Sequence, residues 1–454
     1  MFELKEIANA IDAKLVRTSN YSSFKGVSTD SRTIKKGDVF FALKGDNFDG
    51  HDFIKDALKK GAKAVVISKE KKEIKQNVNV LKVKNTTVAL GKLAKYKRKK
   101  HNIPLIAVTG STGKTTTKDY IYDILTADYR ALKNFGTHNN QIGVPETIFK
   151  INNRHEICVL ELGSNHFGEI SYLSSIAQPQ VAVITNIGAS HLEFLKDLKG
   201  VFKEKKSISS HLKKPKIVLL NGDDGFLRKI KLSKDFKVFF FGQKEGCDFR
   251  ASNICIESNR LSFVFNKKHK FCLNSLGRFN IHNALAAIAC GIIFGIGIKD
   301  IKKALGNFQF PQKRLNKINC HKFSIIDDTY NSNPLSLEKA IESLVEYKTR
   351  GRRILIMGDM LELGESSLEL HRQMGKFISQ KPLDVLITLG EFSRITADEA
   401  QIKSKNLRSV FTFDSKSKLI HFLRTRIKFG DVLLIKGSRL LRMEDITNSL
   451  IKME

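Results

Sequence analysis

Short runs of apolar residues, separated by stretches with helical spacing, recur along most of the chain. In its middle part they occupy residues 105–108, 157–162, 181–187 and 217–221. Towards the C-terminus they occupy residues 324–327, 353–357, 384–389, 410–413 and 431–435. Runs of four to eight apolar residues with polar residues on both sides are typical of strands that are buried in a parallel sheet. The pattern therefore predicts an α/β protein with two separate, mostly parallel sheets.

Three shorter runs follow the central strands and alternate between apolar and polar residues. They occupy residues 253–257, 261–266 and 270–273. Alternation with a period of two is typical of strands with one exposed face, so we expect an antiparallel meander attached to the central sheet. The apolar run 284–298 is shorter than the roughly 20 residues that a membrane-spanning helix needs, and it predicts a buried helix instead.

The chain, with 454 residues, is too long for one ordinary hydrophobic core. We predict three domains, at residues 1–84, 85–310 and 311–454. The first is expected to be a small α/β domain and the second a mostly parallel, doubly wound sheet. The third is expected to be a Rossmann-like sheet. A basic helix over residues 85–102 is expected to lead into the central sheet.

Positive charge is the most unusual feature of the composition. The chain has 78 Lys and Arg against 46 Asp and Glu, which gives a formal net charge of +32. Such a charge is typical of nucleic-acid-binding proteins. Here, however, the lysines are scattered, the clusters such as 95–100 are short, and no nucleic-acid-binding motif accompanies them. We therefore expect solvated lysines and no nucleic-acid partner, with a field that attracts anionic small molecules.

The cysteines and the N-terminal segment indicate the cellular location. The six cysteines form no C-x-x-C pair and have no metal-finger spacing, so we expect reduced packing residues. The first 16 residues are charged and amphipathic and lack the apolar centre of a signal peptide. We expect a cytoplasmic protein that does not insert into a membrane.

The candidate chemistry begins at the end of the first central strand. The sequence GSTGKT occupies residues 110–115, between that strand and a predicted helix. Glycines there let backbone N–H groups surround phosphate oxygens at the helix N-terminus. Lys114 would reach the outer phosphates and the Thr115 hydroxyl would hold Mg²⁺. Val108 replaces the first glycine of the full pattern, but the order of strand, loop and helix still predicts a P-loop-type nucleotide site.

Other polar residues follow the central strands, where open α/β sheets bind their ligands. Glu161 lies near the end of its strand, as an acidic metal ligand should, and His191 and Glu193 follow another strand. The segment 137–141, THNNQ, offers amide groups. A carboxylate and an imidazole next to a phosphate loop predict a Mg²⁺ site.

The other two predicted domains carry their own polar segments. In the C-terminal domain these are residues 327–334, 358–364 and 436–439, each at a strand end. In the N-terminal domain they are residues 29–32 and 49–51. Such clusters often form turns only, so on the residues alone the N-terminal ones remain candidates for either role.

Taken together, these motifs resemble those of the Mur ligases, ATP-dependent enzymes that form amide bonds in bacterial cell-wall synthesis. The similarity extends over residues 28–442 and includes the segments TGSTGKTTT, NIGASHLE and GRFNIHNALAA. DDTYNSNP, GDMLELG and KGSR are more specific and resemble the member that adds the dipeptide D-Ala-D-Ala to UDP-N-acetylmuramoyl-tripeptide. STDSR and DNFDGHDF resemble the segments that hold the UDP end of the substrate.

The resemblance implies a role for each matching position. The residues expected to contact ATP are Gly110, Ser111, Thr112, Gly113, Lys114, Thr115, Thr116, Asn283, Arg314 and Asp328. The expected Mg²⁺ ligands are Thr115, Glu161, His191 and Lys205, the last of them as a carbamate. The expected substrate contacts are Ser31, Arg32, Asp49, Gly50, His51, Asn139, Asn140, Asn333, Lys436, Ser438 and Arg439. Among all of these site residues, the ones expected to be catalytic are Lys114, Lys205 and His191.

Three positions depart from the family pattern. Ser207 stands where a glutamate is common, so the metal-site lysine could be Lys203, Lys205 or Lys206, and Lys205 fits best. Phe279 stands where a histidine is usual, and Lys313 stands where a glycine usually precedes Arg314.

The resemblance also implies the reaction and the partners. ATP and Mg²⁺ would act on the UDP-linked tripeptide and D-Ala-D-Ala through an acyl phosphate, and the enzyme is expected to be a monomer. Two alternatives stay open: a related ligase that adds another amino acid or extends folate with glutamate, and a basic P-loop NTPase that acts on nucleic acid.

Overall fold

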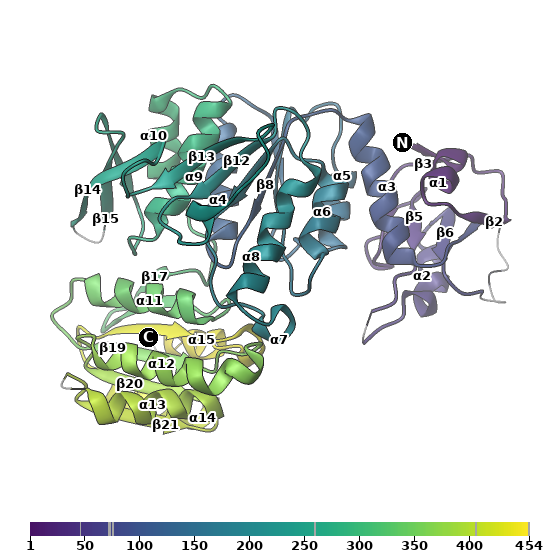
Figure 1. The fold of residues 1–454 in the computed structure, drawn as a ribbon. Helices are drawn as coiled ribbons and strands as arrows, with labels where there is room; N and C mark the ends of the chain where they lie inside the picture. Colours follow the sequence, from purple (N-terminus) through teal and green to yellow (C-terminus); the bar gives the residue numbers. More distant parts are fainter. Residues whose placement is uncertain (46, 71–73, 75–76, 258–259, 405, 453–454) are drawn as a thin grey trace.

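The structure, a computed structural model, describes residues 1–452 except 46, 71–73, 75–76, 258–259 and 405. Three sheets with their own helices form three lobes (Figure 1). The N-terminal lobe lies at the right of the view, the central lobe at the top, and the C-terminal lobe below the central one. The mixed α/β fold with mostly parallel sheets agrees with the prediction from the sequence.

The N-terminal lobe contains a five-stranded sheet. Its order is β2 (Lys14–Arg17), β7 (Asn79–Lys82), β6 (Ala64–Ile67), β5 (Val39–Phe41) and β4 (Val27–Ser28). All neighbours are parallel except β2 and β7. The remaining elements are β1 (Phe2–Glu3), α1 (Leu4–Ala10), β3 (Ser23–Phe24) and α2 (Ile54–Lys59). The predicted basic helix is α3 (Thr86–Lys100), and Asn85 caps its N-terminus.

The central lobe contains a nine-stranded sheet. Its order is β16 (His269–Leu273), β15 (Arg260–Phe265), β14 (Phe249–Glu257), β13 (Lys237–Gly242), β12 (Ile217–Asn221), β11 (Val181–Ile184), β8 (Leu105–Thr109), β10 (Ile157–Glu161) and β9 (Ala131–Lys133). The six strands from β13 to β9 are all parallel to their neighbours. The strands β14, β15 and β16, which come last within this lobe, form the predicted antiparallel meander.

Helices cover both faces of the central sheet. One face packs against α4 (Lys114–Leu125), α9 (Asn280–Ile293) and α10 (Ile298–Asn307). The other packs against α5 (Gly143–Phe149), α6 (Glu169–Ala177) and α8 (Leu198–Lys206). This arrangement buries β8, β10 and β11 on both faces, which explains why they appear in the sequence as continuous apolar runs.

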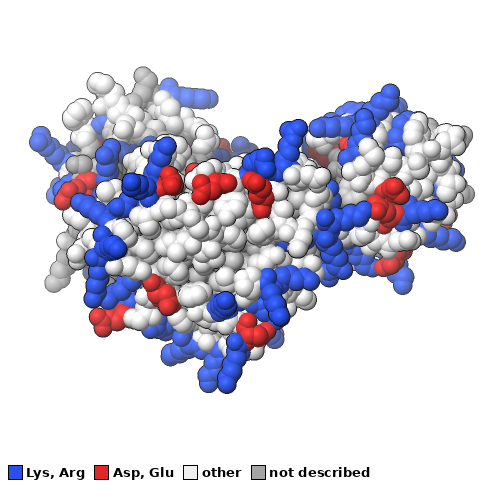
Figure 2. Space-filling view, turned by 90° about the horizontal axis from the view of Figure 1, so that it is seen from above, with Lys and Arg blue, Asp and Glu red and all other residues white. Residues whose placement is uncertain are grey.

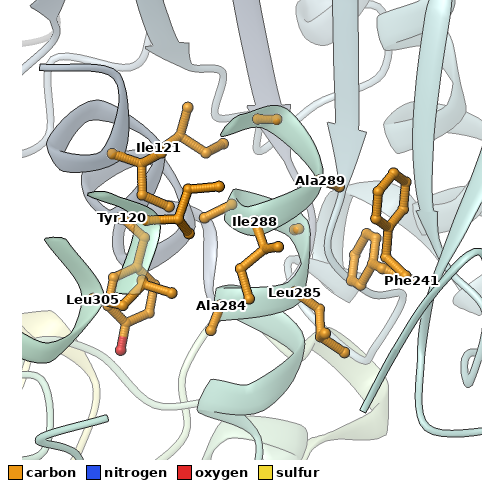
Figure 3. Close-up of a cluster of buried hydrophobic side chains, with 14 of the residues drawn as sticks. Tyr120, Ile121, Phe241, Ala284, Leu285, Ile288, Ala289 and Leu305 are labelled. Atoms are coloured by element: carbon orange, nitrogen blue, oxygen red, sulfur yellow. The ribbon is translucent and has the colours of Figure 1, made fainter. Parts of the chain in front are cut away.

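The apolar run 284–298 forms the centre of this core, but not as one helix. Figure 3 shows Leu285 and Ile288 of α9 between Tyr120 and Ile121 of α4 and Phe241 of β13. The helix ends at Ile293, and α10 begins at Ile298. Gly295 in the break has φ +81°, a left-handed conformation that favours glycine and is common just after a helix. The apolar run therefore is not one continuous helix: residues 284–293 belong to α9, a break follows, and only Ile298 belongs to α10.

The C-terminal lobe contains a six-stranded sheet. Its order is β17 (Asn316–Asn319), β18 (Ser324–Asp328), β22 (Val432–Lys436), β19 (Arg353–Gly358), β20 (Val385–Leu389) and β21 (Ser409–Phe413), with only β17 antiparallel. One face packs against α11 (Pro334–Glu346), α12 (Ser367–Ser379) and α13 (Glu391–Lys403). The other packs against α14 (Lys416–Arg426) and α15 (Glu444–Ile451).

In the central and C-terminal sheets, three strands have no counterpart in the sequence prediction: β9, β13 and β17. β9 has three residues, all of them partly exposed, and β17 (Asn-Lys-Ile-Asn) has a single apolar residue. These two strands lie at the edges of their sheets and lack the apolar run that identifies a buried strand, whereas β13 lies inside its sheet and does contain one, at residues 238–241. The boundaries of the three domains stay predictions. Among the described helices, none is both long and apolar enough to cross a membrane.

Candidate active site

The phosphate loop lies where β8 ends and α4 begins. Gly113 has φ +78° and directly precedes the first residue of the helix, Lys114. A side chain at Gly113 would collide with Asn283, because a Cβ atom there would lie 2.4 Å from its Oδ1. Nζ of Lys114 donates to the carbonyl oxygens of Gly110 (2.8 Å) and Ser111 (3.3 Å), so the lysine folds over its own loop. Burial lowers its pKa. The loop has the geometry expected of a phosphate loop, and its role in binding ATP stays a prediction.

The segment that follows β11 fixes the phosphate loop through hydrogen bonds. The N–H of Thr112 donates to Oδ1 of Asn186 (2.9 Å), and the Ser111 hydroxyl donates to the carbonyl oxygen of Gly188 (2.9 Å). Both partners belong to the NIGASHLE segment. Because β8 and β11 are parallel neighbours, their ends meet at one edge of the sheet and fix the loop.

Glu161, the last residue of β10, faces the first turn of α4. Its Oε2 accepts from the hydroxyl of Thr115 (2.7 Å), and its Oε1 accepts from Nδ2 of Asn139 (2.8 Å). Burial opposes ionisation of Glu161, but the positive charges of Lys114 and Arg314 outweigh it and keep the pKa of the carboxyl below its usual value. A buried, ionised carboxylate next to a threonine hydroxyl is the donor set expected for Mg²⁺.

These donors fit Mg²⁺ better than a metal that needs a full protein cage. The described part of the chain contains no group of three or more His, Cys, Asp or Glu side chains arranged to hold a metal ion. Mg²⁺ usually binds through one or two protein groups together with substrate phosphates and water. Thr115 and Glu161 match that mode, whereas a structural zinc site would need four ligands.

His191 directly precedes the short helix α7 (Leu192–Leu195) and faces the C-terminal lobe. It has φ +53°, and its Nδ1 lies 2.6 Å from Oε2 of Glu362, in the GDMLELG segment. The imidazole lowers the pKa of the Glu362 carboxyl. Glu362 also has a left-handed φ of +63°, so two strained residues meet across the boundary between the sheets.

Lys205 differs from its two lysine neighbours on α8. It is 1% exposed and its Nζ donates to Oγ of Ser164 (2.9 Å), whereas Lys203 is exposed and Lys206 is partly exposed. Burial, together with the charge of Lys114, lowers the pKa of Lys205 to about 7. The three candidates are therefore not equivalent, and only Lys205 turns inward. Its role stays a prediction.

The C-terminal lobe contributes cations and an aromatic ring. The guanidinium of Arg314 lies 3.8 Å from the centre of the Tyr330 ring. Nζ of Lys436, which is 2% exposed, lies 2.5 Å from Oδ2 of Asp328. Lys313 has φ +63°, a left-handed conformation that favours glycine, the residue expected here from the resemblance.

A cavity of about 700 Å³ lies between the central and C-terminal lobes and is lined by residues of both. The predicted site residues that line it are Ser111, Thr112, Gly113, Lys114, Thr115, Thr116, Asn139, Asn140, Glu161, His191, Arg314, Asp328, Asn333 and Lys436. Asn333 also caps α11 with its side chain. The structure therefore places most of the predicted ATP, metal and C-terminal substrate residues around one space.

Ten of the predicted residues do not line this cavity. Lys205 and Asn283 lie behind it, where Asn283 donates to Asn280 (2.9 Å) and Lys205 contacts Ser164. Ser438 accepts from the N–H of Leu361 (2.8 Å). The others, Gly110, Arg439, Ser31, Arg32, Asp49, Gly50 and His51, form no part of the lining.

The N-terminal residues form local pairs in their own lobe. Arg32 has a side chain that is 85% exposed and pairs with Asp30 (2.7 Å). His51 is buried and its Nδ1 lies 2.6 Å from Asp49, which also pairs with Lys69. Asp46, in the DNFDGHDF segment, lies outside the described residues. The role of these residues in binding the UDP end stays a prediction.

Several residues of the site escaped the sequence analysis. Ser164 contacts Lys205, Asn280 and Tyr330 line the cavity, and Glu362 faces His191. Asn280, Tyr330 and Glu362 lie within motifs that the sequence already indicated, and Ser164 lies two residues after the apolar run 157–162. Their individual importance depends on which side chains the tertiary structure turns towards the cavity.

Comparison with known proteins identifies this arrangement. Three family models match: the catalytic domain of the Mur ligase family over residues 23–98, the Mur ligase middle domain over 108–291, and the glutamate ligase domain of Mur ligases over 313–439. The chain is 34% identical to UDP-N-acetylmuramoyl-tripeptide--D-alanyl-D-alanine ligase of Bacillus subtilis, over 99% of this chain and 98% of that protein.

Two solved structures show the same architecture along nearly the whole chain. MurF from Acinetobacter baumannii has a TM-score of 0.90 and 32% identity, with 99% of each chain covered. MurF ligase from Thermotoga maritima in complex with ADP has a TM-score of 0.83 and 31% identity, covering 94% of this chain and 97% of that one. The phosphate loop, the strand-end motifs and the three sheets agree with these matches. This chain belongs to the Mur ligase family.

Proposed function

We propose that the chain is an ATP-dependent ligase that adds D-Ala-D-Ala to UDP-N-acetylmuramoyl-tripeptide in the synthesis of peptidoglycan precursors. The observation that carries this proposal is the cavity in which the phosphate loop of the central sheet faces the DDTYNSNP and GDMLELG segments of the C-terminal sheet. The full-length similarity to ligases of that name supports the choice of substrates.

The reaction would proceed in two balanced steps. An oxygen of the tripeptide carboxylate attacks the γ-phosphorus of ATP, the bond to the β-phosphate oxygen breaks, and ADP leaves. The dipeptide amine then attacks the acyl carbon, the carbon–oxygen bond to phosphate breaks, and the nitrogen loses a proton. Both steps bring several negative charges together, so positioning and electrostatic stabilisation provide most of the catalysis.

The chain's own residues supply this stabilisation. The loop N–H groups and Lys114 would bind the phosphates, with Arg314 and the Asp328–Lys436 pair at the C-terminal side of the nucleotide. Thr115 and Glu161 would hold one Mg²⁺, and His191 with carbamylated Lys205 a second. Bound there, Mg²⁺ would supply positive charge to the phosphate oxygens during transfer.

The environment of Lys205 supports the carbamate. Only a neutral amine can add CO₂, and burial brings the pKa of this amine to about 7, well below that of an ordinary lysine. A carbamate is an anion, so it would remove the repulsion between Lys205 and both Lys114 and a nearby metal. Lys203 is exposed, so burial would not favour its neutral form and a carbamate there would relieve no buried charge repulsion.

The test is phosphate release from ATP by the purified full chain. The proposal expects release only when UDP-N-acetylmuramoyl-tripeptide and D-Ala-D-Ala are both present, with the joined product detected by mass spectrometry. Single amino acids and folate with glutamate serve as competing acceptors and substrates. Turnover with one of them but not with the dipeptide would replace the proposal by the related ligase.

The net charge of +32 favours one rival, an NTPase that acts on nucleic acid. On the face shown in Figure 2, Lys and Arg form several separate groups with white areas between them, rather than one patch. Binding of DNA or RNA that persists in about 0.5 M salt, with ATP hydrolysis stimulated by it, would support the rival.

A further inference from the structure

Asn134, the residue after β9, is buried beside Glu161 and holds its backbone on both sides. Its Oδ1 accepts from the N–H of Glu161 (2.9 Å), and its Nδ2 donates to the carbonyl oxygen of Glu161 (3.0 Å). The last backbone pair between β9 and β10 is Lys133 with Val159. The side-chain amide therefore continues the sheet beyond that pair and fixes the end of β10.

The same amide also anchors the loop that follows. Nδ2 of Asn134 donates a second bond, to the carbonyl oxygen of His138 (2.7 Å). The next residue, Asn139, donates to Oε1 of Glu161. One buried side chain thus sets both the backbone of Glu161 and the loop that orients its carboxylate.

A buried lysine connects the backbone of Asn134 to helix α4, which follows the phosphate loop. Lys118 is 1% exposed and lies one helical turn after Lys114 on α4. Its Nζ donates to the backbone carbonyl oxygen of Asn134 (2.7 Å). Helix α4 therefore positions the Glu161 carboxylate twice, through the hydroxyl of Thr115 and through Lys118 and Asn134.

We propose that Asn134 is a positioning residue for the metal site: it holds the Glu161 carboxylate where it can bind Mg²⁺ together with Thr115. This inference rests on the proposed function, in which Glu161 is a metal ligand. Groups that orient metal ligands commonly change metal affinity by tenfold to a hundredfold when they are lost. A residue that only stabilises the fold would lower stability and leave metal affinity unchanged.

The test variant is Asn134→Leu, which keeps the approximate size of the side chain and removes its three hydrogen bonds. The matched control is Asn79→Leu in the N-terminal sheet. Asn79 is fully buried and likewise holds backbone groups, accepting from Ser19 N (2.8 Å) and donating to the carbonyl oxygen of Tyr21 (2.8 Å). Both variants lose a buried amide, but only one of these amides contacts Glu161.

Three quantities are measured: the affinity of the enzyme–ADP complex for Mn²⁺ by electron paramagnetic resonance, the affinity for ADP without divalent metal, and thermal stability. Mn²⁺ serves as the probe because it takes the same oxygen ligands as Mg²⁺. We expect Asn134→Leu to weaken Mn²⁺ binding about tenfold and to change metal-free ADP binding less than about twofold. Asn79→Leu should lower stability and leave Mn²⁺ affinity unchanged. Unchanged Mn²⁺ affinity in Asn134→Leu, or equal weakening in both variants, overturns the inference.

Two further variants separate the possible failures. If Asn134→Leu does not fold, Asn134→Asp replaces it, since that variant keeps the acceptor and loses both donated bonds. The added negative charge by itself would strengthen metal binding, so a weaker affinity can come only from lost positioning, and an equal or stronger one overturns the inference. Glu161→Gln tests the proposed function itself: if Mn²⁺ affinity is unchanged there, Glu161 is not a metal ligand.

Discussion

The phosphate-loop edge of the central sheet and the predicted substrate segments of the N-terminal sheet are built in different ways. At the phosphate loop, the contacts join residues that are far apart in the sequence, such as Thr115 with Glu161 and Thr112 with Asn186. In the N-terminal segments, Arg32 pairs with Asp30 and His51 with Asp49, each only two residues away.

This difference has a physical consequence for function. Long-range contacts between buried groups fix the phosphate site before a ligand arrives, so little reorganisation is needed when charge develops in the transition state. A local pair with an exposed arginine fixes a turn and leaves the guanidinium available to a ligand. We therefore expect mutations at the central edge to lower kcat, and mutations in the N-terminal segments to raise KM for the UDP substrate.

The largest effect is expected for Lys114→Ala. Removing a charge that neutralises the transferring phosphate should lower kcat by about 10³-fold or more, with thermal stability close to that of the wild type. Phosphate release is the measurement, and circular dichroism confirms the fold. Lys92→Ala, which removes an exposed lysine of α3, is the control. Release at the wild-type rate in Lys114→Ala would exclude the loop from the mechanism.

The second effect concerns the three lysines of α8. Lys205→Ala should lose about 10²-fold in activity, and short carboxylic acids should restore part of it by replacing the missing anion. Lys203→Ala and Lys206→Ala are matched controls on the same helix, and their activity should change little. Full activity in Lys205→Ala, or rescue by acids at Lys203 or Lys206 instead, would contradict the assignment.

The pKa of Lys205 also predicts a pH dependence. Because this pKa is about 7 in the folded protein, the neutral amine that CO₂ requires is lost below about pH 7, and activity should fall there and recover with added bicarbonate. Without CO₂, the unfolded chain binds the Lys205 proton more tightly than the folded one between about pH 7 and 10.5. Stability should therefore rise with pH across that range, and Lys205→Met should flatten the slope.

A smaller effect, of a different kind, is expected for Arg32→Ala. Loss of a charge-assisted hydrogen bond to a substrate should raise KM for the UDP substrate about tenfold, with KM for ATP and kcat within about twofold. Exposed Arg154 provides the control, as Arg154→Ala. If Arg32→Ala lowers kcat instead, the proposed division between the two regions is wrong.

The smallest effect concerns a contact between the N-terminal segment STDSR and helix α5 of the central lobe. The hydroxyl of Thr29 donates to Oε1 of Glu146 on α5 (2.5 Å), which joins the STDSR segment to the central lobe. Thr29→Val should lower the free energy of unfolding by about 1 kcal/mol, as measured by denaturant titration, because it leaves one acceptor without its donor. Ser31→Ala is the comparison in the same segment. A large fall in kcat in Thr29→Val would mean that this contact also controls the chemistry.

The sequence by itself determined the parts of this protein that depend on continuous local patterns. Apolar runs identified the strands that are buried on both faces, such as 217–221, which forms β12 with those bounds. Glycine and lysine spacing identified the phosphate loop, because the glycines allow its backbone conformation and the lysine can reach phosphate oxygens. Strand ends carrying Glu161 and His191 identified the edge at which the candidate site lies.

Only the tertiary structure decided what depends on neighbours that are distant in the chain. It buried Lys205 and left Lys203 exposed, a choice that follows from the packing of α8 and not from the run of lysines. It placed Glu362 against His191, and Asn134 beside Glu161, through pairings between separate sheets and strands. It also ended helix α9 at Ile293, inside the long apolar run. Hydrophobic periodicity shows how strongly a residue prefers burial, but the partner it finds there is set by the packing of the whole chain.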